Sequence, residues 1–213
     1  IAWTLASLGD GIGAIRVTLA AGATAGTSVR VRLVPERTCL LNAAGTLAVH
    51  NQSKAGARFV GIEIEPPMVR AAEKHCADMP SVQIVQGDAR HLELEKSDMI
   101  VSHYTIQFVP PRHRQELFDK IYDRLNWGGA LVMFEKVRAP DARFQDMIAQ
   151  LYNDFKYRNG FSPEEIVEKA RSLKGVMEPF STQGNLDLMA RAGFKDVVTV
   201  QKYLCFEGFL AIK

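Results

Sequence analysis

The sequence lacks the features that mark several large classes of protein. No apolar run approaches the roughly 18 residues that a membrane-spanning helix needs, so no membrane association is expected. The formal net charge is only +2 over 213 residues, which does not indicate a nucleic-acid-binding surface. The three cysteines, Cys39, Cys76 and Cys205, are scattered and odd in number. They predict neither a disulfide framework nor a metal site, and a reducing cytoplasm fits them best.

The bulk composition is that of an ordinary globular domain. Hydrophobic residues make up 47% of the chain and charged residues 23%. The length suits one well-buried domain rather than two, so we expect a single domain over residues 1–213. The chain begins at Ile1 without a methionine, which indicates a truncated or processed start, and no signal-peptide pattern follows.

Strand and helix patterns alternate from residue 58 onward. The expected strands are 59–62, 82–85, 99–102 and 130–134, and the expected helices between them are 66–76 and 112–125. Pro66 and Pro67 suit the first turn of a helix. Because the strands alternate with helices and the connections are long enough for crossovers, the pattern predicts a doubly wound, parallel α/β sheet.

The second half of the chain departs from this alternation. Residues 136–180 indicate a helical insertion, in which Ser162 and Glu165 are spaced as a capping box. Three apolar residues at helical spacing are more typical of a packing stripe than of a substrate pocket: Met147, Leu151 and Phe155. The last two expected strands, 197–203 and 204–213, are joined too closely for a crossover, so one of them should run antiparallel.

Residues 1–57 lack a clear period and are interpreted as a degenerate or aberrant part of the domain. The segment LGDGIGAI contains Gly9, Gly11 and Gly13 and resembles a phosphate-binding loop. It lies too far before Glu63 for one strand–loop–helix–strand unit and has no expected strand before it, so we interpret it as a chance match. At the expected distance stands ERTCLLNAAGTLAV, in which Gly45 is the only glycine.

Two acidic residues that follow expected strands are the main candidates for a binding site. Glu63 ends the first of them, where a carboxylate can accept both hydroxyls of a ribose; the alternative is an acid that favours the dipole of the next helix. Asp88, in the loop QGDARHL, can accept a hydrogen bond from an exocyclic amine such as that of adenine; the alternative is an aspartate that stabilises its own turn. Because both acids fall at carboxyl ends of neighbouring strands, the pair favours a nucleotide-type ligand.

His103 and Tyr104 follow the third expected strand and fall at the same edge of the sheet. They could face a substrate, and a loop histidine bonded to backbone is an equal alternative for His103. Neither a catalytic triad nor a set of metal ligands is visible, so no catalytic residue is assigned.

Several longer stretches resemble a known family. SHYTIQFVPPRHRQELFDKIYDRLNWGGALVMFEK, NDFKYRNGFSPEEI and AGFKDV are similar to the class I S-adenosylmethionine-dependent methyltransferases, and within them to the carboxy-S-adenosylmethionine synthases. The similarity extends over about residues 58–213. It implies a Rossmann-like, seven-stranded and mostly parallel sheet with an antiparallel last strand.

The resemblance also implies a function. It implies a transferase that binds S-adenosyl-L-methionine or its carboxylated form, with a small-molecule substrate such as prephenate, in the pathway of tRNA wobble-uridine modification. It further implies a cytoplasmic homodimer without direct contact to nucleic acid. At the matching positions, Glu63 corresponds to the family's ribose-binding acid, and Ile64 follows it. Asp88 and Ala89 correspond to the family's loop on the adenine side. His103 falls beside the ligand, where the family usually has asparagine.

Three departures from the family pattern bear on activity. The glycine-rich loop after the first strand is absent from residues 31–50, and an out-of-phase reading of that loop favours a frame slip in the source sequence across about residues 31–52. Trp127 stands where a proline precedes paired glycines. Leu188 stands where the synthases have an arginine that pairs with the extra carboxylate, so preference for the carboxylated cofactor should be weak.

Three other functions stay open on the sequence. The chain could be an ordinary S-adenosylmethionine-dependent methyltransferase of another substrate, or a remnant that binds no cofactor because the glycine-rich loop is missing. A nicotinamide-dependent dehydrogenase would use the same ribose-binding acid, but the paired C-terminal strands argue against it.

Overall fold

The described part of the chain falls into two compact units. A computed structural model describes residues 2–7, 13–19, 27–32 and 58–213. Contacts group residues 1–95 into one unit and residues 96–213 into the other. The expectation of a single domain over residues 1–213 remains a prediction.

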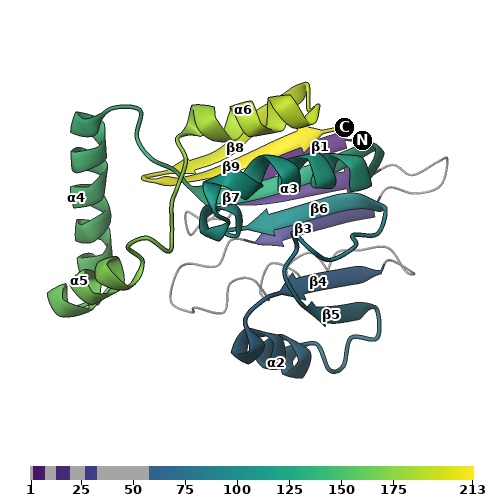
Figure 1. Cartoon of the computed structure of the whole chain (residues 1–213), viewed down its shortest axis with the longest axis horizontal. Helices are drawn as coiled ribbons and strands as arrows, with labels where there is room; N and C mark the ends of the chain where they lie inside the picture. The colour runs from purple at the N-terminus through teal and green to yellow at the C-terminus, as the bar shows by residue number, and fades with distance from the viewer. Residues whose placement is uncertain (1, 8–12, 20–26, 33–57) are drawn as a thin grey trace. The chain divides into compact units, whose positions relative to one another are not determined.

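The first unit begins with a three-stranded antiparallel sheet. Its strands are β1 (Ala2–Ser7), β2 (Gly13–Leu19) and β3 (Thr27–Arg32), in the order β1-β2-β3 (Figure 1). The expectation that no strand precedes the glycines of LGDGIGAI is therefore wrong. The element after them is a strand antiparallel to β1, with Ser7 opposite Gly13, rather than the helix that a phosphate-binding loop requires.

The stretch that should hold the family's first strand and glycine-rich loop is only partly described. Residues 31 and 32 belong to β3. Residues 33–57, including Gly45, lie outside the described residues, so the expected irregularity of this stretch remains a prediction.

A parallel strand pair follows in the first unit, as the sequence predicts. Strand β4 (Phe59–Glu63) is paired in parallel with β5 (Val82–Gln86), and helix α2 (Pro66–His75) connects them. The two prolines begin α2, where a missing backbone N–H costs nothing, and Val69 and Ala72 are its buried residues.

The second unit is built on a four-stranded mixed sheet. Its strands are β6 (Ser97–His103), β7 (Leu125–Lys136), β8 (Asp196–Tyr203) and β9 (Phe206–Ile212), in the order β6-β7-β9-β8. Strands β6 and β7 are parallel, whereas β9 is antiparallel to both of its neighbours. The antiparallel last strand that the short C-terminal connection predicts is confirmed.

Two helices pack against each other over this sheet. Helix α3 (Pro111–Arg124) and helix α6 (Thr182–Ala192) run side by side across one face of it (Figure 1). The apolar side chains that recur along α3 are buried, and so are their counterparts on α6: Leu117, Phe118, Ile121, Leu188 and Met189. This contact makes the core of the second unit, because sheet and helices each bury one apolar face.

The expected seven-stranded sheet is not confirmed as one sheet. From residue 58 onward the structure has six strands, two in the first unit and four in the second. The fold is α/β with mixed sheets. The strand that the family resemblance expects in residues 31–50 would be the seventh, and most of that range lies outside the described residues.

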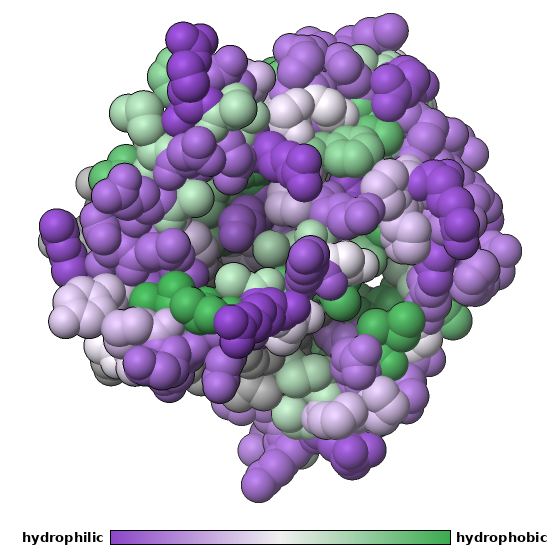
Figure 2. Space-filling view, turned by 60° about the vertical axis from the view of Figure 1, so that its left-hand side comes forward, coloured by the Kyte–Doolittle hydropathy of each residue, from purple (hydrophilic) through white to green (hydrophobic). Residues whose placement is uncertain are grey.

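Residues 136–180 contain two helices, in line with the expected helical insertion. Helix α4 (Ala142–Arg158) is followed by α5 (Pro163–Ser172), whose capping box is confirmed: the Glu165 N–H donates to the Ser162 hydroxyl at 3.2 Å. The expected packing stripe on α4 is packed only in part: Phe155 contacts the ring of Tyr203 on β8, whereas Met147 and Leu151 are 59% and 51% exposed among the described residues. Figure 2 turns this side of the molecule forward, and its hydrophobic residues form separate groups among hydrophilic ones.

The end of α6 gives a test of this packing. Gly193 has a φ of +120°, and a Cβ built on it would lie 2.8 Å from Cζ of Tyr122 on α3. Gly175 also has a positive φ, +75°, but no atom lies within 4 Å of its added Cβ. We expect Gly175→Ala to cost about 1 kcal/mol of unfolding free energy from backbone strain. Gly193→Ala should cost about 1–3 kcal/mol more, because it adds overpacking to that strain.

Urea unfolding followed by circular dichroism measures both changes. The two substitutions are matched controls, since each places alanine at a positive φ in the same unit. Equal losses of unfolding free energy would show that the contact between Gly193 and Tyr122 does not limit the packing of α3 on α6.

Candidate functional site

Glu63 is a buried carboxylate at the carboxyl end of β4. Its side chain is 6% exposed, and its Oε1 accepts a hydrogen bond of 2.9 Å from the backbone N–H of Glu65, the residue that precedes α2. Its Oε2 is also buried and has no hydrogen-bond partner among the described residues. A buried acceptor oxygen without a donor is costly, so this atom is a candidate to receive a ligand hydroxyl.

The strand pair brings Glu63 and Asp88 to the same edge of the first unit. Glu63 lies opposite Gln86 in the parallel register, and the N–H of Gly87 donates to the Glu63 carbonyl at 2.9 Å. The loop after β5 turns closely, because a Cβ on Gly87 would lie 2.8 Å from Cδ1 of Leu92. The nearness that strand order predicts for the two acids is therefore present.

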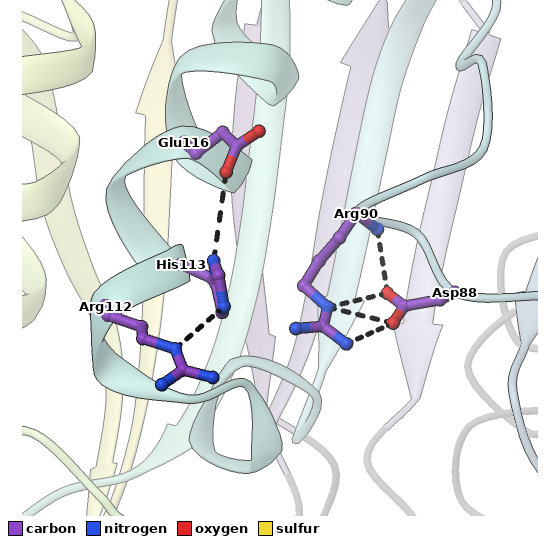
Figure 3. A network of polar contacts seen from close by, with 5 residues as sticks. All are labelled: Asp88, Arg90, Arg112, His113 and Glu116. Carbon is purple, nitrogen blue, oxygen red and sulfur yellow. Dashed lines mark hydrogen bonds and ion pairs between the residues drawn. The ribbon is translucent and has the colours of Figure 1, made fainter.

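Asp88 is held by a residue of its own loop. Arg90 donates its backbone N–H and its Nε to Oδ1, at 2.9 and 3.0 Å, and its Nη2 to Oδ2, so the arginine folds back on the carboxylate (Figure 3). These hydrogen bonds lower the pKa of Asp88 and keep it ionised. The expected alternative, an aspartate that stabilises its own turn, describes this contact. To bind an adenine amine, an oxygen of Asp88 would have to accept a hydrogen bond from the amine as well as from Arg90.

The two other residues expected near the ligand flank these acids. Ile64 follows Glu63 and is 54% exposed, so it offers an apolar surface beside the carboxylate. Ala89 follows Asp88 and is half-buried in the same loop. Both remain predictions as binding residues.

His103 lies in the second unit, at the carboxyl end of β6. Its imidazole is buried and makes edge-to-face contacts with Tyr104 and Phe134, with ring centroids 4.6 and 5.8 Å apart. Tyr104 has a φ of +54°, a left-handed conformation that is uncommon outside glycine. A non-glycine residue in this conformation at a strand end is a feature that functional sites often keep.

Sequence reasoning missed the carboxylate that organises this strand end. Glu135 is 1% exposed on β7, and it accepts three backbone hydrogen bonds from the 3₁₀ turn η1 (Ile106–Phe108) and the residue before it. The donors are the N–H groups of Thr105 and Ile106 to Oε1, at 3.1 and 2.9 Å, and of Gln107 to Oε2, at 2.9 Å. The available signal was an acid at the end of a buried strand, as at Glu63.

A buried arginine continues this network toward the start of α6. Arg114 on α3 donates to the carbonyls of Val109 and Glu178, at 2.8 and 2.6 Å, and its guanidinium lies 4.2 Å from the ring centroid of Phe180. Gln107 completes it, since its side-chain oxygen accepts the Lys136 N–H at 2.9 Å. The loop after β6 is therefore held by hydrogen bonds to β7 and α3.

The described residues contain neither a metal-binding group nor a membrane-spanning helix. No group of three or more histidine, cysteine, aspartate and glutamate side chains in them is placed to hold a metal ion. Among the same residues, no helix is both long and apolar enough to cross a membrane.

Comparison with known proteins identifies the family of the chain. Residues 42–129 match the family model described as a methyltransferase domain. The carboxy-S-adenosyl-L-methionine synthase of Staphylococcus epidermidis is 32% identical over 163 residues, which are 76% of this chain and 71% of that protein. The enzyme of the same name from Campylobacter jejuni is 43% identical over 157 residues, 73% of this chain and 67% of that protein.

Solved structures share the fold at low sequence identity. The YcgJ protein from Bacillus subtilis has a TM-score of 0.60 at 11% identity, over 81% of this chain and 88% of its own. Human N-acetylserotonin methyltransferase, solved with S-adenosylmethionine, has a TM-score of 0.55 at 18% identity, over 82% of this chain and 48% of its own. These likenesses support a methyltransferase-type α/β fold.

The burial of Glu135 should make stability depend on pH. Burial raises the pKa of Glu135 to about 8, against the lowering effects of the three N–H donors and of Arg114. The folded state therefore holds a proton that the unfolded state has lost above its ordinary pKa of 4.5. We expect the unfolding free energy to fall by roughly 1–3 kcal/mol as the pH rises from 4.5 to 8. Glu135→Gln, which cannot ionise, should remove this part of the slope.

Urea titrations at five pH values across this range measure the effect. Glu165→Gln is the control, because that carboxylate caps α5 at the surface. A slope that is unchanged in Glu135→Gln would show that the carboxylate is ionised in the folded state throughout this range.

Proposed function

The chain belongs to the class I S-adenosylmethionine-dependent methyltransferases, next to the carboxy-S-adenosyl-L-methionine synthases, and we propose that it binds this cofactor at the edge formed by Glu63 and Asp88. The family consists of S-adenosylmethionine-dependent transferases. The single observation that carries the proposal is the buried Oε2 of Glu63, which lacks a donor among the described residues. A ribose hydroxyl would supply that donor.

The reaction that fits is transfer of a group at the sulfonium of the cofactor. Such a reaction depends on positioning and electrostatics rather than on a fixed acid–base pair. Residues of the chain would bind and orient the cofactor. Glu63 would accept a hydrogen bond from the ribose, and Ile64 and Ala89 would contact the faces of the nucleoside. Asp88 would accept a hydrogen bond from the adenine amine in addition to those from Arg90. His103 would be a binding residue of the second unit. The acceptor would be a small molecule, and direct contact with nucleic acid is not required.

The finer assignment follows the relatives. We propose the synthase reaction, in which prephenate supplies a carboxyl group to the cofactor, within tRNA wobble-uridine modification in the cytoplasm. The similarity to proteins named carboxy-S-adenosyl-L-methionine synthase supports it. The rival is methyl transfer to another substrate, which Leu188 favours, because a leucine cannot pair with a carboxylate.

A homodimer is part of the proposal. Helix α4 exposes Phe144, Met147 and Leu151 at helical spacing, and no buried residue lies on this helix. A second copy of the chain would cover these apolar side chains, which the described residues leave exposed.

Calorimetric titration of the chain with three ligands separates the proposal from its rivals. Binding of S-adenosylmethionine or its carboxylated form supports the proposal, whereas binding of NAD alone indicates a dehydrogenase. No binding of any of the three indicates a remnant without cofactor.

Replacement of Glu63 tests the site itself. Glu63→Ala removes the charge-assisted hydrogen bond that Oε2 would accept from a ribose hydroxyl, so we expect at least about a tenfold loss of affinity for S-adenosylmethionine. Glu65→Ala is the matched control, since it removes a neighbouring exposed acid and keeps the N–H that bonds Glu63. If Glu63→Ala binds the cofactor as the unmodified chain does, Glu63 serves the start of α2 and not the ligand.

The residue at position 188 bears on the choice between the plain and the carboxylated cofactor. Leu188 is 2% exposed and lies in the contact between α3 and α6, so this position offers no cation to a carboxylate. We therefore expect dissociation constants for the plain and carboxylated cofactors that differ by less than about threefold, since no ion pair distinguishes them. Calorimetry with both ligands measures the ratio.

Strong selectivity for the carboxylated form would contradict this expectation. It would assign the pairing to another cation, and Arg191 is the first to replace, since it is exposed on α6 and its Nε donates to Gln115 at 2.7 Å. Arg191→Gln would then abolish the selectivity, with the exposed Arg171→Gln on α5 as the control.

A further inference from the structure

Arg90 engages both carboxylate oxygens of Asp88 at the same time. Oδ1 accepts the backbone N–H of Arg90 at 2.9 Å and its Nε–H at 3.0 Å. Oδ2 accepts the same Nε–H at 2.8 Å, together with an N–H of Nη2 (Figure 3). Each oxygen therefore has two contacts with donors of Arg90. A carboxylate offers about four acceptor positions, so these contacts occupy all of them.

The backbone of the loop orients Asp88 without help from the guanidinium group. The hydrogen bond from the backbone N–H of Arg90 closes an Asx turn, which any residue except proline at position 90 would keep. The carbonyl of Asp88 also accepts the N–H groups of His91 and Leu92, at 2.9 and 3.0 Å. Three main-chain donors thus hold the residue in place. What the guanidinium group adds to Asp88 is contact with the oxygens that a ligand would use.

The ion pair between the two side chains is accessible to a ligand. The side chains of Arg90 and Asp88 are 27% and 20% exposed. Ion pairs that water reaches contribute little free energy, because water screens the charges and the long side chains lose freedom when they pair. An incoming amine therefore has a small free energy to overcome, and its affinity for the chain is reduced by that amount.

We propose that the side chain of Arg90 competes with the ligand for Asp88 and thereby lowers the affinity of the chain for adenine nucleosides. On binding, the backbone N–H keeps its hydrogen bond to Oδ1, while the guanidinium group gives up one acceptor position to the 6-amino group of the ligand. This inference rests on the proposed function, because that proposal assigns Asp88 to the adenine amine. It adds to that site a residue that sets the affinity through Asp88.

Two neutral nucleosides test the competition on the full chain. Adenosine has the 6-amino group, and purine riboside has the same ring system and ribose without it. Neither ligand has the methionine part of the cofactor, so both probe the nucleoside part of the proposed site alone. Ligand-observed NMR titrations give the dissociation constants, and thermal unfolding confirms that each variant is folded.

Four variants isolate the contribution of the guanidinium group. Arg90→Met keeps the backbone N–H and much of the aliphatic length but removes the side-chain donors, and Arg90→Lys keeps the charge. Arg70→Met removes one positive charge at an exposed position of α2 in the same unit and is the matched control. Glu63→Ala reports whether the nucleoside occupies the proposed site.

We expect Arg90→Met to bind adenosine about two- to fivefold more tightly than the unmodified chain does, which is the range of a partly exposed ion pair. Its affinity for purine riboside should not change, because that ligand has no amine to offer Asp88. Arg90→Lys should bind adenosine less tightly than Arg90→Met, and Arg70→Met should equal the unmodified chain. A rise in salt from about 50 to 500 mM should tighten adenosine binding by the unmodified chain and not by Arg90→Met, since salt screens the ion pair.

Either of two results would overturn this inference alone. One is adenosine affinity that is unchanged or lower in Arg90→Met, which would make Arg90 a support of the site rather than a competitor. The other is equal tightening for adenosine and purine riboside, which would show a general change of the loop. In both cases, adenosine binding that Glu63→Ala weakens keeps the proposed function. No binding of adenosine by any variant would overturn the proposed function and this inference with it.

Discussion

Three backbone N–H groups converge on the carboxylate of Glu135, and the carboxyl edge of the four-stranded sheet depends on this contact. The donors belong to the turn that connects β6 to α3, so the end of one strand is fixed by a side chain of the next. Buried N–H groups must find acceptors, and few other groups could accept three of them at once. Tyr104 immediately precedes this turn and keeps a left-handed backbone there.

A second buried carboxylate lies directly across from the first. Glu207 on β9 is paired with Glu135 on β7, and residues that face each other in an antiparallel pair point to the same side of the sheet. Glu207 has its own partners, the hydroxyl of Thr182 at 2.7 Å and the ammonium group of Lys202. Two adjacent acids are tolerated because separate elements provide the donors: the turn after β6 for one, and α6 and β8 for the other.

Local signals in the sequence predicted much of the fold. The capping box of Ser162 and Glu165, the prolines that begin α2 and the antiparallel last strand all depend on neighbouring residues or on a short connection, and all are confirmed. The antiparallel sheet of β1 to β3 had no such signal, because its strands show no clear period. The exposure of Met147 and Leu151 could not be read from spacing either, since spacing defines a stripe but not what covers it.

The sequence predicted some acids of the candidate site but not the distant groups that bind them. An acid at a strand end identified Glu63, and the same rule applied to Glu135 would have identified it as well. Which of these acids is satisfied within the chain depends on donors distant in sequence, 28 to 30 residues away for Glu135. The Arg90 that engages Asp88 is only two residues away, so that contact was visible in the loop sequence.

The contrast between these acids explains why Glu63 is the stronger candidate. The oxygens of Glu135 and Asp88 are all engaged by donors of the chain. One oxygen of Glu63 accepts the N–H of Glu65, the residue before α2, as expected for an acid that supports the start of a helix. The other oxygen is buried without a donor among the described residues. The hydrogen bond to Glu65 therefore uses one of the two carboxylate oxygens and fixes the orientation of the other. The remaining oxygen is pre-oriented at no further entropic cost, which is the condition under which a ligand hydroxyl gains most from a single hydrogen bond.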